Sequence, residues 1–272
     1  MPHEFDPGYG AEPFRSLCAD YPDSTVYPQS DFRTEWGPMF HRGRLDGSAR
    51  VLVLGQDPAA NETIARRILT GVAGQRTQGF LAKLGIDRSY LMINTFLYSV
   101  WGQQGGNKHE KDPAIAAYRN RWIDAAFDTS PIEAVIALGS LADTAWHTWK
   151  KTPKGQATQV AYAHIMHPTA PDSANKDDPE KLAAATQAML ANWNKGLSSL
   201  SPAIKHPDHA AALVPYGTAF QNGDIVEIPE IDMPPGLPAW MRGSDPWAQR
   251  TGATTAVKRA TITVTVPAEF LP

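Results

Sequence analysis

The sequence predicts an α/β protein: a three-layer sandwich around a central, mostly parallel four-stranded sheet, with a proline-rich C-terminal extension. From residue 51 onward, short apolar segments alternate with longer amphipathic segments, which is typical of strands joined by crossover helices. The apolar segments contain few polar positions, as expected for parallel strands that helices cover on both faces. The chain has 272 residues, 42% of them hydrophobic, which is enough for one substantial core.

The first 49 residues are rich in aromatic residues, prolines and charges, and they show little periodicity. We expect a short helix and loops that pack on the domain. Strands are predicted at 51–54, 90–94, 134–139 and 160–167. Helices are predicted at 62–70, 75–84, 113–127, 140–150 and 179–197, with Ser140 as an N-cap. These elements define a domain over residues 1–200.

Residues 201–272 form the extension, in which recurring prolines interrupt every candidate element except one. Residues 259–266 alternate between apolar and polar side chains, which predicts a strand at a sheet edge or in a partner. We expect the extension to pack on the domain, and we assign it no independent domain.

Composition excludes several classes of protein. A single cysteine, Cys18, excludes internal disulfides and any all-cysteine zinc or iron–sulfur site supplied by one chain, and we expect no metal or cofactor. No apolar run reaches about 18 residues. The N-terminus lacks the features of a signal peptide, so we expect a cytoplasmic protein without a membrane partner. The net charge of -3 leaves nucleic acid open, because a local basic patch suffices for binding.

Polar side chains follow three of the four predicted strands. Gln56 and Asp57 come after the first strand, Asn94 ends the second, and His167 follows the fourth. Because the carboxyl ends of parallel strands meet at one edge of a sheet, these groups are expected to converge on a site. Each has a simpler interpretation: Asp57 caps the helix expected near Asn61, Asn94 closes a turn, and His167 is a structural hydrogen-bonding group.

Three short motifs at these positions resemble those of the uracil-DNA glycosylase superfamily, in the same order along the chain. They are Gly55-Gln56-Asp57-Pro58, Ile93-Asn94-Thr95 and His167-Pro168-Thr169. The resemblance covers about residues 51–197 and includes 71–75 and 135–140. It implies a monofunctional DNA-repair glycosylase, a monomer that hydrolyses the N-glycosidic bond of uracil in single- or double-stranded DNA and leaves an abasic site.

The resemblance also implies a role for each strand-end group. Bond cleavage places positive charge on the deoxyribose and negative charge on the departing uracil. Asp57 orients the attacking water and stabilises the sugar, and neutral His167 donates a hydrogen bond to uracil O2. The amide of Asn94 matches the O4 and N3–H edge of a flipped uracil and opposes the reversed pattern of cytosine.

The remaining uracil contacts are expected from Gln56, Ala59 and a stacking side chain, either Leu69 or Phe80. Ala59 stands where the most widespread branch of the superfamily carries a tyrosine that excludes thymine. We expect a side chain from the N-terminal segment or from the extension to close that space instead. The cysteines that hold an iron–sulfur cluster in one branch are absent, so the chain resembles a divergent branch.

Contacts to DNA are expected from turns at the same edge, at Pro58, Ser140, Thr169, Ala170 and Pro171. Ser140 and Thr169 are suitable phosphate donors. Pro171 stands where the widespread branch carries an intercalating leucine. The lysines at 150–154 follow the far end of a helix, and we interpret them as a solvated helix end that is favoured by the helix dipole.

Two other functions remain open. A binding module could use the same pocket to hold uracil-containing DNA without turnover, although it would not need Asp57 and His167. An α/β hydrolase or transferase could act on free nucleosides, with the extension covering its cleft.

Overall fold

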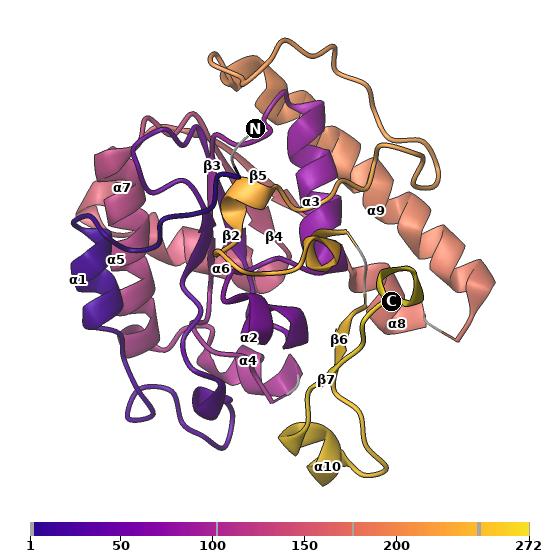
Figure 1. The fold of residues 1–272 in the computed structure, drawn as a ribbon. Coiled ribbons are helices and arrows are strands. Elements are labelled where there is room, and N and C mark those ends of the chain that lie inside the picture. The colour runs from indigo at the N-terminus through magenta and orange to yellow at the C-terminus, as the bar shows by residue number, and fades with distance from the viewer. Residues whose placement is uncertain (1–2, 102, 176, 244–245, 272) are drawn as a thin grey trace.

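The computed structural model describes residues 3–101, 103–175, 177–243 and 246–271, and it contains a five-stranded mixed sheet with helices on both faces (Figure 1). The strand order is β1-β3-β2-β4-β5. Four strands are parallel: β2 (Val51–Gly55), β3 (Tyr90–Asn94), β4 (Ala134–Leu138) and β5 (Ala161–Ile165). The α/β class and the mostly parallel sheet are therefore confirmed.

The prediction of four strands is wrong, because β1 (His41–Gly43) adds a fifth strand antiparallel to β3. β1 has three residues, two of them polar, so it carries no apolar run that sequence periodicity could detect. It is buried all the same, since it pairs with β3 at the edge of the sheet.

Successive side chains of the strands point to opposite faces and form two separate cores. Leu52 and Leu54 of β2 join the core under α1 (Phe14–Ala19), α5 (Pro113–Thr129) and α6 (Ser140–Trp149). Val51 and Val53 join the core under α3 (Val72–Lys83) and α9 (Pro179–Leu200). This arrangement of a sheet between two helical layers is compatible with the predicted sandwich.

Helix boundaries follow local capping chemistry. The Asp112 side chain accepts hydrogen bonds from the Ala114 and Ile115 amides at the start of α5, where Pro113 is the first helical residue. Asp178 caps α9 in the same manner. The other short helices are α4 (Gln103–His109), α7 (Pro153–Ala157), α8 (Ala170–Asn175) and α10 (Thr255–Ala260).

The helix predicted at 62–70 is shorter than expected. It is α2 (Ala60–Ala65), and the chain leaves the helix at Arg66, whose φ is 57°. The Glu62 carboxylate accepts hydrogen bonds from the backbone amides of Ala59, at 3.0 Å, and Thr70, at 3.1 Å. This buried carboxylate folds the segment after the helix back onto its start, which replaces the last predicted turns.

Ser140 is the first residue of α6 and not its N-cap. Gly139 takes the cap position with a φ of 84°, a left-handed conformation that a glycine adopts without strain.

The extension crosses the sheet edge before it forms an arm. Asp232 is completely buried and pairs with Arg42 of β1, at 2.9 Å, and with Arg44. Further along, Trp247 and Ala248 pack against α2 through a third hydrophobic cluster. The extension therefore contacts both the antiparallel edge of the sheet and the helix that follows β2.

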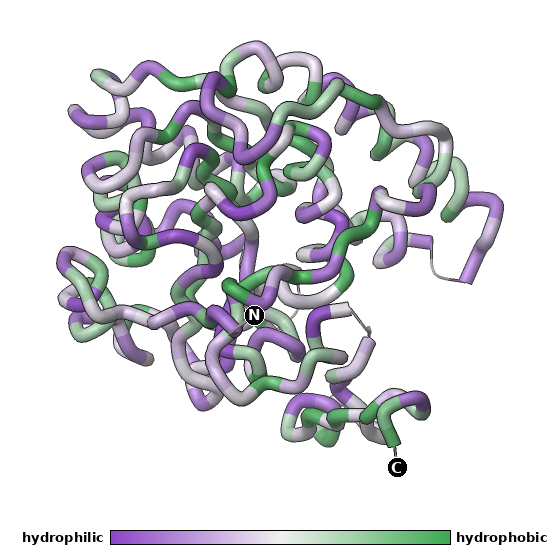
Figure 2. The backbone as a smooth tube through the Cα atoms, turned by 45° about the horizontal axis from the view of Figure 1, so that its top comes forward, coloured by the Kyte–Doolittle hydropathy of each residue, from purple (hydrophilic) through white to green (hydrophobic). Residues whose placement is uncertain are grey.

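The strand predicted at 259–266 is wrong in its extent. Residues 259 and 260 end α10, and the strand is only β7 (Thr263–Val264). It pairs with β6 (Ala248–Gln249) in a two-stranded antiparallel ribbon. The ribbon and α10 project from the body of the molecule in Figure 1, and Figure 2 shows hydrophobic residues at the outer C-terminal end. Within the part of the chain that the structure describes, no helix is both long and apolar enough to cross a membrane.

Candidate active site at the strand ends

The ends of β2 and β3 bring Asn94 and Leu69 together over Gly55. Gly55 pairs with Asn94 in the last register position of the two strands. A Cβ atom on Gly55 would lie 2.2 Å from Asn94 Oδ1 and 3.6 Å from Leu69 Cδ1. Only a glycine leaves room for the Asn94 amide at this point, so the glycine of the first motif positions the asparagine of the second.

Gln56, which follows β2, and His167, which follows β5, meet over Gly139 at the end of β4. A Cβ atom on Gly139 would lie 2.6 Å from Gln56 Nε2 and 3.2 Å from His167 Cβ. The Gly139 amide donates a hydrogen bond of 2.9 Å to the Ile165 carbonyl, which keeps β5 beside β4 up to its end. The predicted groups at 56, 94 and 167 therefore lie along one edge of the sheet.

Asp57 does not cap the helix after β2, so that simpler interpretation is wrong. Its Oδ2 accepts a hydrogen bond of 3.1 Å from the Val100 backbone amide. The N-cap of α2 is Ala59, whose amide is satisfied by Glu62 instead. The Asp57 carboxylate is thus held at the sheet edge by the segment that follows β3.

The environment of Asp57 raises its pKa to about 7, chiefly because surrounding protein removes water from the carboxylate although the residue keeps partial contact with solvent. The nearby Glu62 charge adds to this rise, whereas the amide of Val100 and the cations Arg250 and Arg33 oppose it. A carboxyl group with a pKa near 7 is typical of functional sites, where acids and bases have strongly shifted pKa values.

His167 is neutral and its tautomer is fixed. Burial lowers the pKa of its imidazole to about 4. The Thr169 amide donates a hydrogen bond of 3.3 Å to His167 Nδ1, and the Thr169 hydroxyl lies 3.2 Å from the same nitrogen. Because Nδ1 accepts the amide proton, the ring hydrogen resides on Nε2, which is therefore available as a donor.

The turn that carries His167 is fastened from two helices. Trp193 of α9 donates its indole N–H to the Met166 carbonyl, at 2.9 Å. Arg76 of α3 donates to the Pro168 carbonyl, at 2.7 Å, and pairs with Asp172 of α8. Arg76 lies 91 positions before His167 in the chain and belongs to no motif, so sequence reasoning missed it.

Asn94 holds an acceptor without a partner. Its side chain is 9% exposed, and its Oδ1 has no hydrogen-bond partner among the described residues. Leaving such a group unpaired costs about 1–3 kcal/mol. Leu69 beside it has a φ of 54°, a left-handed conformation that is rare for a residue with a branched side chain. Unpaired acceptors and strained backbone together are typical of functional sites.

The other predicted uracil contacts are placed differently. Ala59 is exposed in the turn after β2, and closure of the space beside it by another side chain stays a prediction. Phe80 is fully buried and packs edge-on against Trp193 with ring centroids 5.6 Å apart. Phe80 therefore belongs to the core under α9, and of the two predicted stacking side chains only Leu69 lies beside Asn94.

The predicted DNA contacts lie in the turns at the same edge of the sheet. Pro58 is buried in the turn after β2, and Ser140 is exposed at the start of α6. Thr169 precedes α8, which Ala170 and Pro171 open. Pro171 is buried, so it does not project as a wedge in this conformation.

Two of the lysines at 150–154, Lys150 and Lys154, have structural partners. Lys150 donates to the carbonyls of Gly155 and Thr158, and Lys154 donates to the Asp124 carbonyl at 2.9 Å. They fasten the end of α6 to its surroundings, consistent with our interpretation of a helix end and not of a DNA contact.

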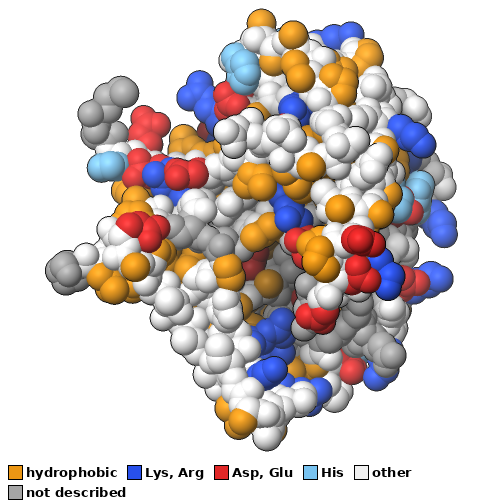
Figure 3. All heavy atoms as spheres, turned by 90° about the vertical axis from the view of Figure 1, so that its right-hand side faces the viewer, with side chains coloured by type: hydrophobic (Ala, Val, Ile, Leu, Met, Phe, Trp, Pro, Cys, Tyr) orange, Lys and Arg blue, Asp and Glu red, His pale blue; other side chains and the backbone are white. Residues whose placement is uncertain are grey.

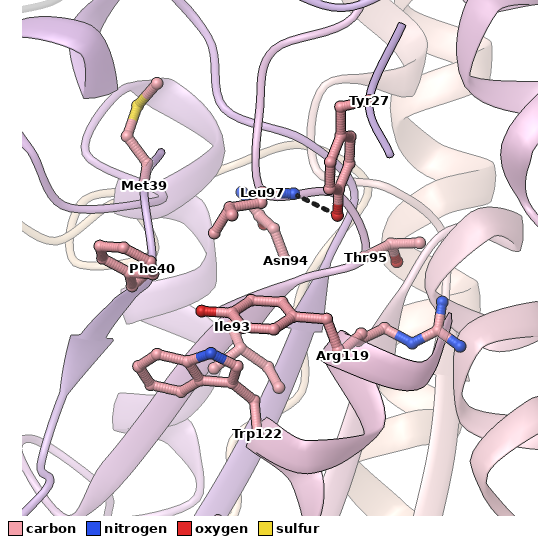
Figure 4. A pocket seen from close by; sticks show the side chains of 10 residues that line it. Tyr27, Met39, Phe40, Ile93, Asn94, Thr95, Leu97, Arg119 and Trp122 are labelled. Atoms are coloured by element: carbon pink, nitrogen blue, oxygen red, sulfur yellow. Dashed lines mark hydrogen bonds between the residues drawn. The ribbon is translucent and has the colours of Figure 1, made fainter. Parts of the chain in front are cut away.

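A cavity of about 20 Å³ lies beside the end of β3, and Asn94 is among the residues that line it (Figure 4). Its walls are mainly aromatic and aliphatic and include Tyr27, Phe40, Tyr118 and Trp122. Figure 4 shows the Tyr27 hydroxyl next to the Leu97 amide, to which it is hydrogen-bonded at 3.4 Å. The volume suffices for about one water molecule, which is too small for a base.

No family model and no curated protein matches this chain. The described residues contain no group of three or more histidine, cysteine or acidic side chains placed to hold a metal ion. The function is therefore inferred from three groups at the strand ends. They are the Asp57 carboxyl group with a pKa near 7, the neutral imidazole of His167, and the Asn94 amide with its unpaired oxygen.

Proposed function

We propose that this protein is a divergent, monofunctional uracil-DNA glycosylase, which hydrolyses the bond between uracil and deoxyribose in DNA. The observation that carries the proposal is the unpaired Asn94 Oδ1, buried against Gly55 at the sheet edge that also holds Asp57 and His167. The buried Asn94 amide has a free acceptor, and two further polar groups lie at the same edge. Such a site suits a ligand that supplies a hydrogen-bond donor to the amide oxygen.

Uracil supplies the donor and acceptor that this amide lacks. Its N3–H donates to Asn94 Oδ1, and its O4 accepts from the Asn94 Nδ2 amide group. Cytosine presents an acceptor at N3 and a donor at C4, so it leaves both groups of Asn94 unpaired. Rejection on such polar grounds is stronger than rejection by shape alone. Leu69, adjacent to Asn94, provides apolar contact with the flipped ring.

Catalysis then depends on two charges that develop as the glycosidic bond breaks. Asp57 in its ionised form stabilises the cationic sugar and orients water toward C1′. The Nε2–H of His167 donates to uracil O2 as negative charge accumulates on the leaving base. The hydrogen bond from Thr169 keeps the proton on that nitrogen. Both groups act in a partly dehydrated site, where their electrostatic effects are larger than in water.

Flanking phosphates are assigned to Ser140 and Thr169, and the start of α8 at Ala170 lies next to the bound DNA. The nucleotide leaves the base stack before reaction, which costs a few kcal/mol in duplex and less in a single strand. The protein acts as a monomer in this proposal, since all the groups it invokes come from one chain.

The test is release of uracil from oligonucleotides that contain one deoxyuridine, followed by alkaline cleavage at the abasic sites. Wild type should cleave the uracil strand, leave a thymine strand intact, and leave free deoxyuridine intact. Asp57→Asn serves as the variant with impaired chemistry, and His164→Ala, an exposed position on β5, serves as the matched control.

Each alternative function has its own outcome in the same assay. Tight binding to uracil-DNA by wild type, without release of base, would favour the binding module. Hydrolysis or phosphorolysis of free deoxyuridine in preference to the oligonucleotide would favour the nucleoside enzyme.

A further inference from the structure

A groove beside Asp57 collects basic and aromatic side chains from three distant parts of the chain. Its volume is about 320 Å³. The residues that line it are Arg33, Trp101, Arg250, Thr255, Lys258 and Arg259. One wall thus comes from the segments that precede β1 and follow β3, and the other comes from α10 and the residues before it. We call these C-terminal residues, 246–266, the arm.

The groove contains four cationic side chains: Arg33, Arg250, Lys258 and Arg259. None of them forms an ion pair with a carboxylate in the described part of the chain. Arg33 is 3% exposed, and its Nε has no hydrogen-bond partner among the same residues. Burial and the nearby charges of Arg250 and Arg259 lower the pKa of Arg33 to about 10, although the charges of Glu35 and Asp57 oppose this change. A buried cation among other cations is unfavourable unless something anionic joins it.

Aromatic rings hold two of these cations, Arg33 and Arg259, in place. The Arg33 guanidinium lies 3.8 Å from the centroid of Trp101 and 4.4 Å from that of Trp36. The Arg259 guanidinium lies 4.9 Å from the Trp101 centroid, and its backbone carbonyl accepts a hydrogen bond from Arg33 at 3.2 Å. Cation–π contacts of this kind fix a guanidinium without neutralising it, so its donors remain available.

The groove opens next to the proposed active site. Trp101 directly follows Val100, whose amide holds the Asp57 carboxylate at 3.1 Å. The Arg33 amide donates to the Ser99 carbonyl at 2.8 Å, which fixes the other part of this wall to the same segment. Arg250 and Arg33 are near enough to Asp57 to lower its pKa. A chain whose reacting unit lies at Asp57 would therefore place its neighbouring units in this groove.

Lys and Arg side chains are visible at the lower end of the face in Figure 3, the height at which α10 lies in Figure 1. The contrast with Lys150 and Lys154 is informative, because those two lysines have carbonyl or acidic partners. Unneutralised cations in a concave surface bind a flexible polyanion, since they replace the counterions that the polyanion carries in solution.

We propose that the arm and Arg33 form a groove for the phosphodiester backbone of the DNA strand that enters the site, and this rests on the proposed function for the identity of the polymer. The arm contributes Arg250, Lys258 and Arg259 as phosphate contacts, and Arg33 forms the floor beside Asp57. The extension is then part of the substrate-binding surface.

The experiment measures binding of a uracil-free, fluorescently labelled single-stranded oligonucleotide over a series of salt concentrations. The groove variant is Arg250→Gln, Lys258→Gln, Arg259→Gln, and all three positions are exposed. The matched control is Lys151→Gln, Lys195→Gln, Lys205→Gln, which removes the same charge from other exposed positions. Thermal unfolding of all three proteins verifies that each is folded.

The slope of log affinity against log salt should become shallower by roughly 2 in the groove variant, about 0.7 for each lost phosphate contact. Affinity at low salt should fall by at least about tenfold, with wild-type behaviour in the control. Equal slopes and affinities for wild type and the groove variant would overturn the proposal. Binding to vesicles of anionic phospholipid with no binding to the oligonucleotide would overturn it too, in favour of a membrane surface.

The uracil-release assay on wild type separates this proposal from the proposed function. If wild type releases no uracil while the groove variant loses salt-dependent DNA binding, the glycosylase proposal fails and the groove stands. If wild type releases uracil while the groove variant binds DNA as wild type does, the groove fails and the glycosylase proposal stands.

Discussion

At the scale of single residues, the site combines a carboxyl group that resists ionisation with an imidazole that resists protonation. Burial is the main cause in both cases, because it disfavours the charged form of either group. At neutral pH, the Asp57 carboxyl group is therefore close to its pKa, and His167 is an uncharged hydrogen-bond donor. Their pKa values are thus reversed from the usual order of an aspartate and a histidine.

Replacing Asp57 tests this order. Asp57→Asn should lower the single-turnover rate by about 10²-fold or more, because the amide carries no charge to stabilise the sugar. In wild type, kcat/KM should rise with pH up to about 7 as Asp57 ionises, and this limb should be missing in the variant. A pH–rate profile of both proteins measures the effect, and an unchanged profile in the variant would remove Asp57 from the mechanism.

The same substitution has a consequence for stability. A proton binds Asp57 more tightly in the folded state than in the unfolded state, so folding stability falls as pH rises from 3.8 to about 7. Asp57→Asn removes this loss and should stabilise the protein above pH 7. The shift from 3.8 to about 7 sets an upper bound of roughly 4 kcal/mol. Denaturant unfolding at pH 5 and pH 8 measures the difference.

Replacing His167 tests the leaving-group donor. His167→Ala should raise the barrier by about 2.7–4 kcal/mol, the range typical of losing one preorganised donor to a developing negative charge. Single-turnover cleavage at saturating enzyme separates this effect from binding. His164→Ala, three residues earlier, should cleave at the wild-type rate. A His167→Ala variant that binds weakly but cleaves normally once saturated would contradict the assigned role.

At the scale of elements, the helices position groups that the strands supply. Glu62 of α2 folds the segment with Leu69 against the sheet through two backbone amides. Arg76 of α3 and Trp193 of α9 fasten the turn with His167. These contacts explain how the site keeps its conformation although Asn94 Oδ1 is unpaired and the Leu69 backbone is in the left-handed region.

Arg76→Met tests the positioning of the His167 turn. The variant loses the donors to Pro168 and Asp172, and a small displacement of the imidazole should lower the single-turnover rate by about tenfold. In the double variant with His167→Ala, the Arg76 substitution should cause almost no further loss, because its effect acts through the imidazole. Additive losses would instead indicate a general structural role for Arg76.

At the scale of the whole molecule, the extension contacts two parts of the sheet: the antiparallel edge at β1 and the region of the strand-end site. Asp232 neutralises Arg42 and Arg44 at the antiparallel edge, and the arm reaches the strand-end site on the other side of α2. Near the C-terminus, the extension exposes Val266, Phe270 and Leu271. The extension is therefore anchored by a buried ionic cluster, and its far part remains available to contact a ligand.

Asp232→Ala tests that anchor. Removing the carboxylate leaves two arginines without their buried partner, which should lower the free energy of unfolding by about 3–5 kcal/mol. Glu230→Ala, which removes an exposed pair with His3, should change it by at most about 1 kcal/mol. Urea unfolding curves of the two variants measure the contrast, and equal effects would show that the cluster is not an anchor.

The sequence by itself determined the four parallel strands and the chemical groups at their ends. Both are local properties: a run such as Val51–Leu54 is apolar because helices cover both faces, and Gln56, Asp57, Asn94 and His167 directly follow or end such runs. Gly55 is part of a motif, although its reason, the room it leaves for Asn94, became visible only in three dimensions.

Only the tertiary structure decided β1, the left-handed path at Leu69, and the partners of Asp57 and His167. It also brought Arg33 against Arg259, 226 residues away in the chain. Such contacts depend on pairing, burial and charge between distant segments, and these forces leave no periodic pattern in either segment alone. The sequence thus supplied the strand-end groups, whereas folding supplied their pKa values, the unpaired acceptor and the basic groove.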